Sequence, residues 1–149
     1  MKKKILFISA SGGHLEQLMM LKPLMDKYPS IVVTEKTKVN SKSDYFMLQA
    51  GAKHKPVMIR FVINFFIALF IFLKERPTHI VSTGGIIGVP FVYISKLAKT
   101  KIIFIETFAR VHDSTRTGRF MYKHADLFLV QWESLLKIYP NAKHGGSIY

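Results

Sequence analysis

The chain has 149 residues, 49% of them apolar, which is enough to form the core of a single domain over residues 1–149. It has no cysteine, which excludes disulfides and thiolate chemistry, and its 22 Lys and Arg against 9 Asp and Glu give a formal net charge of +13. That charge predicts a polyanionic partner: nucleic acid, anionic lipid or a phosphorylated substrate. The cations are interspersed among apolar segments instead of forming one stripe, which favours a membrane surface over nucleic acid.

Short apolar runs alternate along the chain with longer amphipathic ones. In the first half we expect a strand over 5–8, a helix over 14–27, a strand over 31–34, a polar loop over 35–44, a short helix over 44–50, a strand over 55–59 and an apolar helix over 60–74. In the second half we expect a strand over 80–82, a helix over 86–98, a strand over 101–106, a loop over 107–117, a short helix over 118–124, a strand over 127–130, a helical turn over 133–138 and an edge strand within 142–149. This alternation predicts a parallel sheet covered on both faces, in a Rossmann-like doubly wound α/β domain.

A Gly-Gly-His turn follows the first predicted strand. Gly12 and Gly13 permit positive φ and a close backbone approach, and the next helix presents free N–H groups, so the turn suits a phosphate or diphosphate. It is neither a G-x-G-x-x-G motif nor a P-loop. The alternative is a tight turn in which Ser11 caps the helix. His14 at this position suits a general base or a phosphate donor.

Polar residues also follow two later predicted strands. Thr83, Gly84 and Gly85 form a second glycine turn, and two such turns at neighbouring strand ends predict one shared crevice. Glu106 ends the next strand, where its carboxylate would face the crevice, orient a sugar hydroxyl, act on a proton or pair with Arg110. The alternative is a purely structural Glu–Arg pair.

Residues 61–73 (FVINFFIALFIFL) carry no charge. Thirteen helical residues extend about 20 Å, which is short of the roughly 30 Å hydrocarbon core of a bilayer. We therefore expect either a buried core helix or, preferably, a helix lying in the membrane interface with flanking cations reaching the head groups. The residues expected at the membrane are Arg60, Phe61, Phe65, Phe66, Phe70, Phe72 and Lys74.

Taken together, these motifs resemble the Alg14 family, and in particular its bacterial capsule and exopolysaccharide relatives of the PssD/CpsF type. The resemblance lies in residues 11–14 (SGGH), 82–85 (STGG), 105–111 (IETFARV), 117–118 (TG), Tyr122, Asp126 and 131–132 (QW). The Gly-Gly-His turn also resembles the N-terminal half of MurG-type GT-B glycosyltransferases. Thr107 stands where many relatives have serine, which keeps a hydroxyl.

The resemblance implies the N-terminal half of a split GT-B glycosyltransferase at the cytoplasmic face of the cell membrane. It implies an Alg13-like chain as the C-terminal half, a UDP-sugar donor and a polyprenyl-diphosphate-linked saccharide acceptor, with no cofactor or metal ion. Hexosyl transfer would need both chains. The residues that it implies are His14 or Glu106 for proton transfer and, for the acceptor diphosphate, Ser11, Gly12, Gly13, Thr83, Gly84, Gly85 and Arg110. The alternatives are a stand-alone phosphate- or nucleotide-binding protein and a nucleic-acid-binding protein. Nucleic acid is disfavoured, because the aromatic residues lie mainly within apolar runs.

Overall fold

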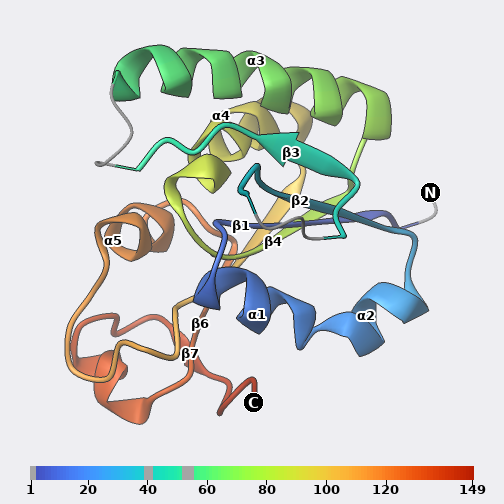
Figure 1. The fold of residues 1–149 in the computed structure, drawn as a ribbon. Coiled ribbons are helices and arrows are strands. Elements are labelled where there is room, and N and C mark those ends of the chain that lie inside the picture. Colours follow the sequence, from blue (N-terminus) through green and yellow to red (C-terminus); the bar gives the residue numbers. More distant parts are fainter. Residues whose placement is uncertain (1–2, 39–41, 52–55) are drawn as a thin grey trace.

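The computed structural model describes residues 3–38, 42–51 and 56–149. In this described part, seven parallel strands form one sheet in the order β3-β2-β1-β4-β5-β6-β7 (Figure 1). The strands are β1 (Ile5–Ser9), β2 (Ser30–Glu35), β3 (Tyr45–Met47), β4 (His79–Gly84), β5 (Lys101–Ile105), β6 (Leu127–Val130) and β7 (Lys143–His144). The order reverses between β1 and β4, which is where open parallel sheets bind ligands beyond their carboxyl ends. The Rossmann-like fold class is confirmed.

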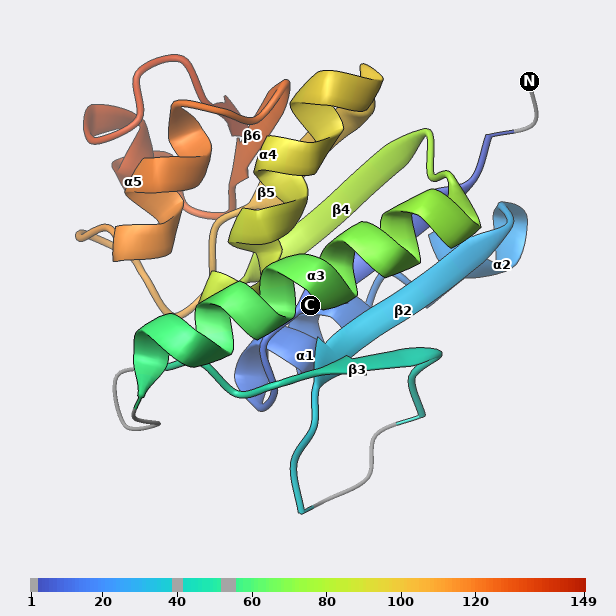
Figure 2. The same cartoon turned by 90° about the horizontal axis from the view of Figure 1, so that it is seen from above.

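Helices cover both faces of this sheet. They are α1 (Gly13–Met19), α2 (Lys22–Lys27), α3 (Val57–Glu75), α4 (Val89–Ala98) and α5 (Arg116–Tyr122), with 3₁₀ turns η1 (Ile86–Gly88) and η2 (Glu133–Lys137). Helices α1 and α2 lie on one face, while α3 and α4 lie on the other (Figures 1 and 2). The central strands are therefore buried on both sides, and all five residues of β1 are buried. This explains why these strands read as unbroken apolar runs.

Three sequence predictions are wrong, each for a local reason. The helix expected over 14–27 is two helices, because Pro23 lacks an N–H and its ring excludes a continuing helix; it lies instead in the first turn of α2. The helix expected over 44–50 is an edge strand, β3. There Tyr45 and Met47 pack on the core and Phe46 is exposed, the period of two typical of a strand.

The strand expected over 55–59 also fails. Lys55 lies outside the described residues, and Pro56 precedes the first residue of α3, Val57. The remaining predicted strands and helices form within a few residues of their expected bounds. Helix α3 ends where Arg76 adopts a left-handed conformation, and Pro77 follows.

Candidate functional site

The two glycine turns meet at the carboxyl edge of the sheet, as predicted. The first follows β1 and the second follows β4, and these strands are neighbours. The Nδ1 atom of His14 lies 2.9 Å from the carbonyl oxygen of Thr83. In return, the Thr83 hydroxyl donates to the His14 carbonyl at 2.7 Å. These reciprocal bonds fix the start of α1 against the end of β4.

Two of the glycines are required by this close contact. A Cβ atom on Gly84 would stand 2.6 Å from the His14 ring, and one on Gly85 would stand 2.4 Å from Cβ of Ala10. Both residues also have positive φ, at 130° and 96°, which side chains disfavour. Their role is therefore to let the two turns touch.

The other two glycines face open space. A Cβ atom added at Gly12, which has φ 77°, or at Gly13 would meet no described atom within 4 Å, so both leave the backbone exposed on the outer side of the turn. The first N–H groups of α1 have no partner within the helix. Ser11 does not cap α1, so that alternative is wrong. Its hydroxyl and its backbone N–H both donate to Glu35 Oε2, at 3.1 and 3.3 Å.

Glu106 is buried beneath the edge and does not line an open crevice. The residue is only 1% exposed. The carboxylate accepts hydrogen bonds from the Thr107 N–H at 3.0 Å, the Thr115 hydroxyl at 3.3 Å and the Tyr139 hydroxyl at 2.7 Å. Burial, and next the hydrogen bond to Glu106, raise the pKa of Tyr139 well above its ordinary value of 10.0.

The expectation that Glu106 faces the crevice is therefore wrong in this structure, and so is its pairing with Arg110. Arg110 is exposed and forms an ion pair with Asp113. Gly118 explains how the carboxylate fits, because a Cβ atom there would lie 1.9 Å from Glu106 Oε2. The Thr117-Gly118 motif thus marks a packing requirement around a buried carboxylate.

A buried amide network, missed by the sequence analysis, joins α1 to the loop that follows β5. Gln17 donates to the Thr107 hydroxyl at 3.1 Å, and its Oε1 accepts from the Phe108 N–H at 3.1 Å and from Gln131 at 3.0 Å. Gln131 also donates to the Glu106 carbonyl at 3.0 Å. The helix that carries His14 and the loop that follows Glu106 are therefore held as one unit. The adjacent Gln131-Trp132 pair after β6 was the available signal.

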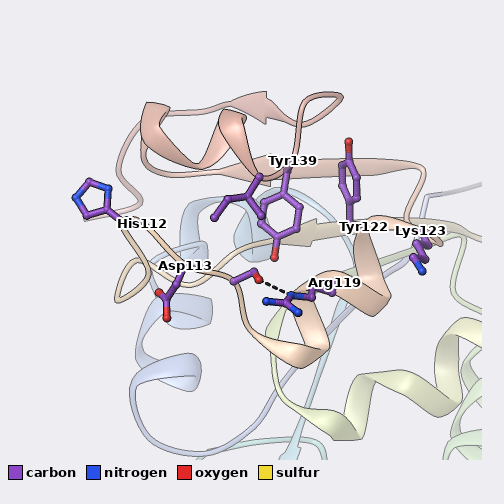
Figure 3. Close-up of a pocket in the computed structure, with 8 residues that line it drawn as sticks. His112, Asp113, Arg119, Tyr122, Lys123 and Tyr139 are labelled. Atoms are coloured by element: carbon purple, nitrogen blue, oxygen red, sulfur yellow. Dashed lines mark hydrogen bonds between the residues drawn. The ribbon is translucent and has the colours of Figure 1, made fainter.

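A pocket of about 500 Å³ lies beside this unit, between the loop after β5, α5 and the end of η2 (Figure 3). Arg119, Lys123 and His112 supply nitrogen donors around it, and Arg119 donates to the Ser114 hydroxyl at 2.5 Å. Tyr139 lies between the pocket and Glu106, since its ring lines the pocket and its hydroxyl bonds the carboxylate. Because Asp113 adds a carboxylate to these donors, the mixed lining suits a hydroxyl-rich ligand.

Helix α3 presents a second surface of a different kind. Asn64, Ala68 and Ile71 face the core, whereas Phe66 and Phe70 are 63% and 60% exposed. Within the described chain, α3 is one helix with the length and composition of a membrane span, and only 22% of its apolar window is buried. The helix is therefore longer than its uncharged stretch of 13 residues, and it packs on the core along one side only.

The residues expected at the membrane do not all lie on this exposed surface. Phe72 is buried, which corrects its assignment, and Phe65 is half-buried against the core. Phe61 is half-buried, and Arg60 donates to the Gln49 carbonyl at 3.2 Å. The sequence analysis missed five further exposed apolar residues of this surface, which are Met58, Ile59, Val62, Ile63 and Leu73. Lys74 lies over the Phe70 ring, 5.8 Å from its centroid.

The Rossmann-like fold of this chain is similar to one part of larger solved proteins. The chain superimposes on the UDP-N-acetylglucosamine 2-epimerase of Rickettsia bellii with TM-score 0.75 and 16% identity, covering 99% of this chain and 46% of that one. It superimposes on MurG of Acinetobacter baumannii with TM-score 0.74 and 11% identity, covering 95% of this chain and 44% of MurG. The chain thus spans less than half the length of either protein.

Sequence comparison gives the family. Residues 35–148 match the family described as "Oligosaccharide biosynthesis protein Alg14 like". The chain is 29% identical over 172 aligned positions to the UDP-N-acetylglucosamine transferase subunit ALG14 of Yarrowia lipolytica, covering 96% of this chain and 80% of that protein. It is 36% identical over 91 positions to the subunit of the same name in Candida albicans, covering 57% and 42%. The chain belongs to the Alg14 family.

Proposed function

We propose that this chain is the acceptor-binding, membrane-associating subunit of a two-component glycosyltransferase. In this proposal an Alg13-like chain supplies the C-terminal half and most contacts to a UDP-sugar. The acceptor is a polyprenyl-diphosphate-linked saccharide of capsule or exopolysaccharide synthesis, reached at the cytoplasmic face of the membrane. Membership of the Alg14 family supports the assignment. The superposition on MurG also supports it, because this chain covers 44% of MurG, which is the length expected of one half.

The observation that carries the proposal is the position of His14. A carbonyl oxygen only accepts hydrogen bonds, so the bond to Thr83 selects the His14 tautomer that carries its proton on Nδ1. The lone pair is then on Nε2, which is the atom needed for a general base. In the proposed reaction an acceptor hydroxyl attacks the anomeric carbon of the UDP-sugar, its proton moves to Nε2, and UDP departs with the electrons of the broken glycosyl bond.

The surrounding residues take supporting roles. Gly12 and Gly13, with open space on their outer side, let the acceptor diphosphate approach the backbone. The Thr83 carbonyl holds the His14 ring, Gly84 lies against that ring, and Gly85 lets the second turn approach Ala10. Arg110 can leave Asp113 and bind the diphosphate instead, because an exposed ion pair contributes only about 0–1 kcal/mol to stability.

Glu106 and Ser11 fit positioning roles better than direct ones. Glu106 gathers Thr107, Thr115 and Tyr139 around one buried carboxylate and so fixes the loop that carries Arg110. Ser11 gives both of its donors to Glu35 and thereby fixes the first turn. Both residues act on the acceptor through the backbone that they hold.

For the membrane, the docking of α3 favours an interfacial position over a span. Asn64 exchanges two hydrogen bonds of 2.8 Å with the backbone of Leu48, so the helix is fastened along the sheet. A helix fixed in this way brings its outer apolar side to the interface while the rest of the domain stays in water. Arg60 and Lys74 flank that side at its two ends.

The test is sugar transfer to a lipid-diphosphate acceptor in membranes by this chain co-expressed with its C-terminal-half partner. We expect activity only with both chains. The variant His14→Ala should lower kcat by about 10²–10⁴-fold, as expected for loss of a general base. The control is His79→Ala, at the opposite edge of the sheet, which should retain activity. Full transfer by the partner alone, or tight nucleotide binding by this chain without transfer, would favour the stand-alone binding protein.

A further inference from the structure

A groove runs between α3 and α4 on the outer face of the domain. The two helices lie over the same face of the sheet, and their carboxyl ends diverge (Figure 2). The space between them, of about 380 Å³, has an almost wholly apolar lining that includes Leu69, Leu73, Tyr93 and Leu97. Leu97 is 91% exposed and Leu73 is 63% exposed. Exposed apolar side chains gathered around one groove are typical of a surface that meets an apolar partner.

The groove adjoins a basic depression near the carboxyl ends of α3 and α4. This second space, of about 460 Å³, shares Phe72 and Ala98 with the groove and is also lined by Arg76 and Lys99. Each of these two cations directly follows the last residue of a helix, α3 for Arg76 and α4 for Lys99. Both are exposed. The groove between α3 and α4 thus ends beside two positive charges.

The charges at this end are free to bind an anion. Among the described residues, no carboxylate forms an ion pair with Arg76 or Lys99. Glu75 is the neighbouring acid, and it is already engaged by Lys4 at 2.5 Å and by the Tyr45 hydroxyl. The charge pattern therefore complements an amphiphile with an anionic head and an apolar tail.

The geometry points to a binding site for one anionic phospholipid of the membrane surface. One acyl chain would occupy the α3–α4 groove, and the phosphate would lie between Arg76 and Lys99. The inference rests on the proposed membrane-facing position of α3. The site is distinct from the proposed acceptor site, because Arg76 and Lys99 precede β4 and β5 and so lie at the amino edge of the sheet, whereas Gly12 and Gly13 lie at the carboxyl edge. A lipid held there would fix how the domain lies on the membrane.

The first experiment measures binding of the full chain to vesicles of phosphatidylcholine with and without phosphatidylglycerol. The double variant Arg76→Gln/Lys99→Gln removes the two charges. Lys22→Gln/Lys27→Gln, on α2 at the other face of the sheet, removes the same net charge. Since each cation near an anionic surface contributes roughly a five-fold gain in affinity, we expect a loss on the order of twenty-fold for the first variant. The loss for the α2 control should be less than about three-fold.

The second experiment tests the groove itself. Leu97→Gln should weaken binding to phosphatidylglycerol vesicles, whereas Met20→Gln, at an exposed position on α1's carboxyl side, should not. In NMR spectra, monomeric short-chain phosphatidylglycerol should shift the Leu73 and Leu97 methyl signals with one-to-one stoichiometry, and glycerol phosphate should leave them unchanged. The side chains replaced are exposed, so circular dichroism should show unchanged folding.

Several results would overturn the inference. Equal losses for the two charge variants would show that bulk charge acts without a site. Unchanged binding by Leu97→Gln, or shifts caused by glycerol phosphate alone, would exclude the groove. Self-association that Leu97→Gln abolishes in the absence of lipid would make the groove a protein interface. A wild-type chain that binds neither kind of vesicle would overturn the membrane role of α3 as well, whereas binding without the Arg76 and Lys99 dependence overturns only this site.

Discussion

The carboxyl edge of the sheet and the outer face of α3 and α4 differ in the side chains that they carry and in how far those side chains are buried. At the edge, polar groups are buried and paired: Glu106 has three donors, and Gln17 and Gln131 share an amide network. On the helix face, Phe66, Phe70 and Leu97 are exposed and apolar. Hydrogen bonds are directional, so the edge depends on particular neighbours, whereas apolar contact depends mainly on area. Substitutions at the edge should therefore lower folding stability, whereas substitutions on the helix face should lower membrane binding and leave folding stability nearly unchanged.

The largest effect is expected from Phe66→Asp/Phe70→Asp. Fully burying a Phe side chain contributes about 1.5–3 kcal/mol, so losing two from the lipid should lower vesicle affinity by more than about 100-fold. Folding stability should change by less than about 1 kcal/mol, because both side chains are exposed. Vesicle sedimentation and urea unfolding measure the two quantities. Phe65→Asp is unsuitable, since Phe65 packs on the core. Unaltered sedimentation of the folded variant would remove the interfacial role of α3.

Gly118→Ala should destabilise the carboxyl edge of the sheet and leave the exposed face of α3 and α4 unchanged. Its Cβ atom would stand 1.9 Å from Glu106 Oε2, and we expect a loss of about 1–3 kcal/mol in the free energy of unfolding despite the better helix propensity of alanine. The matched control is Gly13→Ala, which meets open space and should change stability by less than about 1 kcal/mol. Chemical denaturation compares them. Equal stabilities of the two variants would mean that Glu106 and the residues bonded to it shift to admit the new Cβ atom with no loss of folding free energy.

Tyr139→Phe tests the same cluster by removing one donor. The lost hydrogen bond goes to a buried carboxylate, and such bonds contribute about 1.5–3 kcal/mol. Tyr122→Phe is the control, because its hydroxyl accepts from the backbone N–H of the exposed Asn141. Thermal unfolding of both variants should show the larger loss for Tyr139→Phe. A larger loss for Tyr122→Phe would contradict the central place of Glu106.

The smallest effect concerns how α3 is fastened to the sheet, and it depends on pH. Hydrogen bonds from Lys4 and then from Tyr45 hold the pKa of Glu75 below its ordinary value of 4.5. A depressed folded-state pKa gives stability that is present above pH 4.5 and is lost as the pH falls through the folded pKa. Glu75→Gln should therefore be less stable than wild type at about pH 7, and the difference should shrink in acid. Urea midpoints at both pH values test this, and a constant difference would refute it.

The sequence predicts the fold well because the signals are local and strong. The continuous apolar runs of β1 and β5 mark strands of the sheet, and the uncharged stretch 61–73 marks the centre of α3, which begins before it at Val57. Errors arise where a local pattern is short or interrupted. Three residues at β3 carry too little periodicity to separate strand from helix, and Pro23 splits α1 from α2.

For the site, the order of residues along the chain is enough to establish which turns follow which strands, and hence that Gly12, His14 and Gly84 belong to one edge. Packing in three dimensions was needed to show that His14 bonds the Thr83 carbonyl while Glu106 turns inward to Tyr139, since both contacts depend on side chains brought together from distant segments. Packing also selects which face of α3 is open. Phe66 and Phe72 are the same residue type in one apolar run, and only docking on the sheet buries the second and exposes the first.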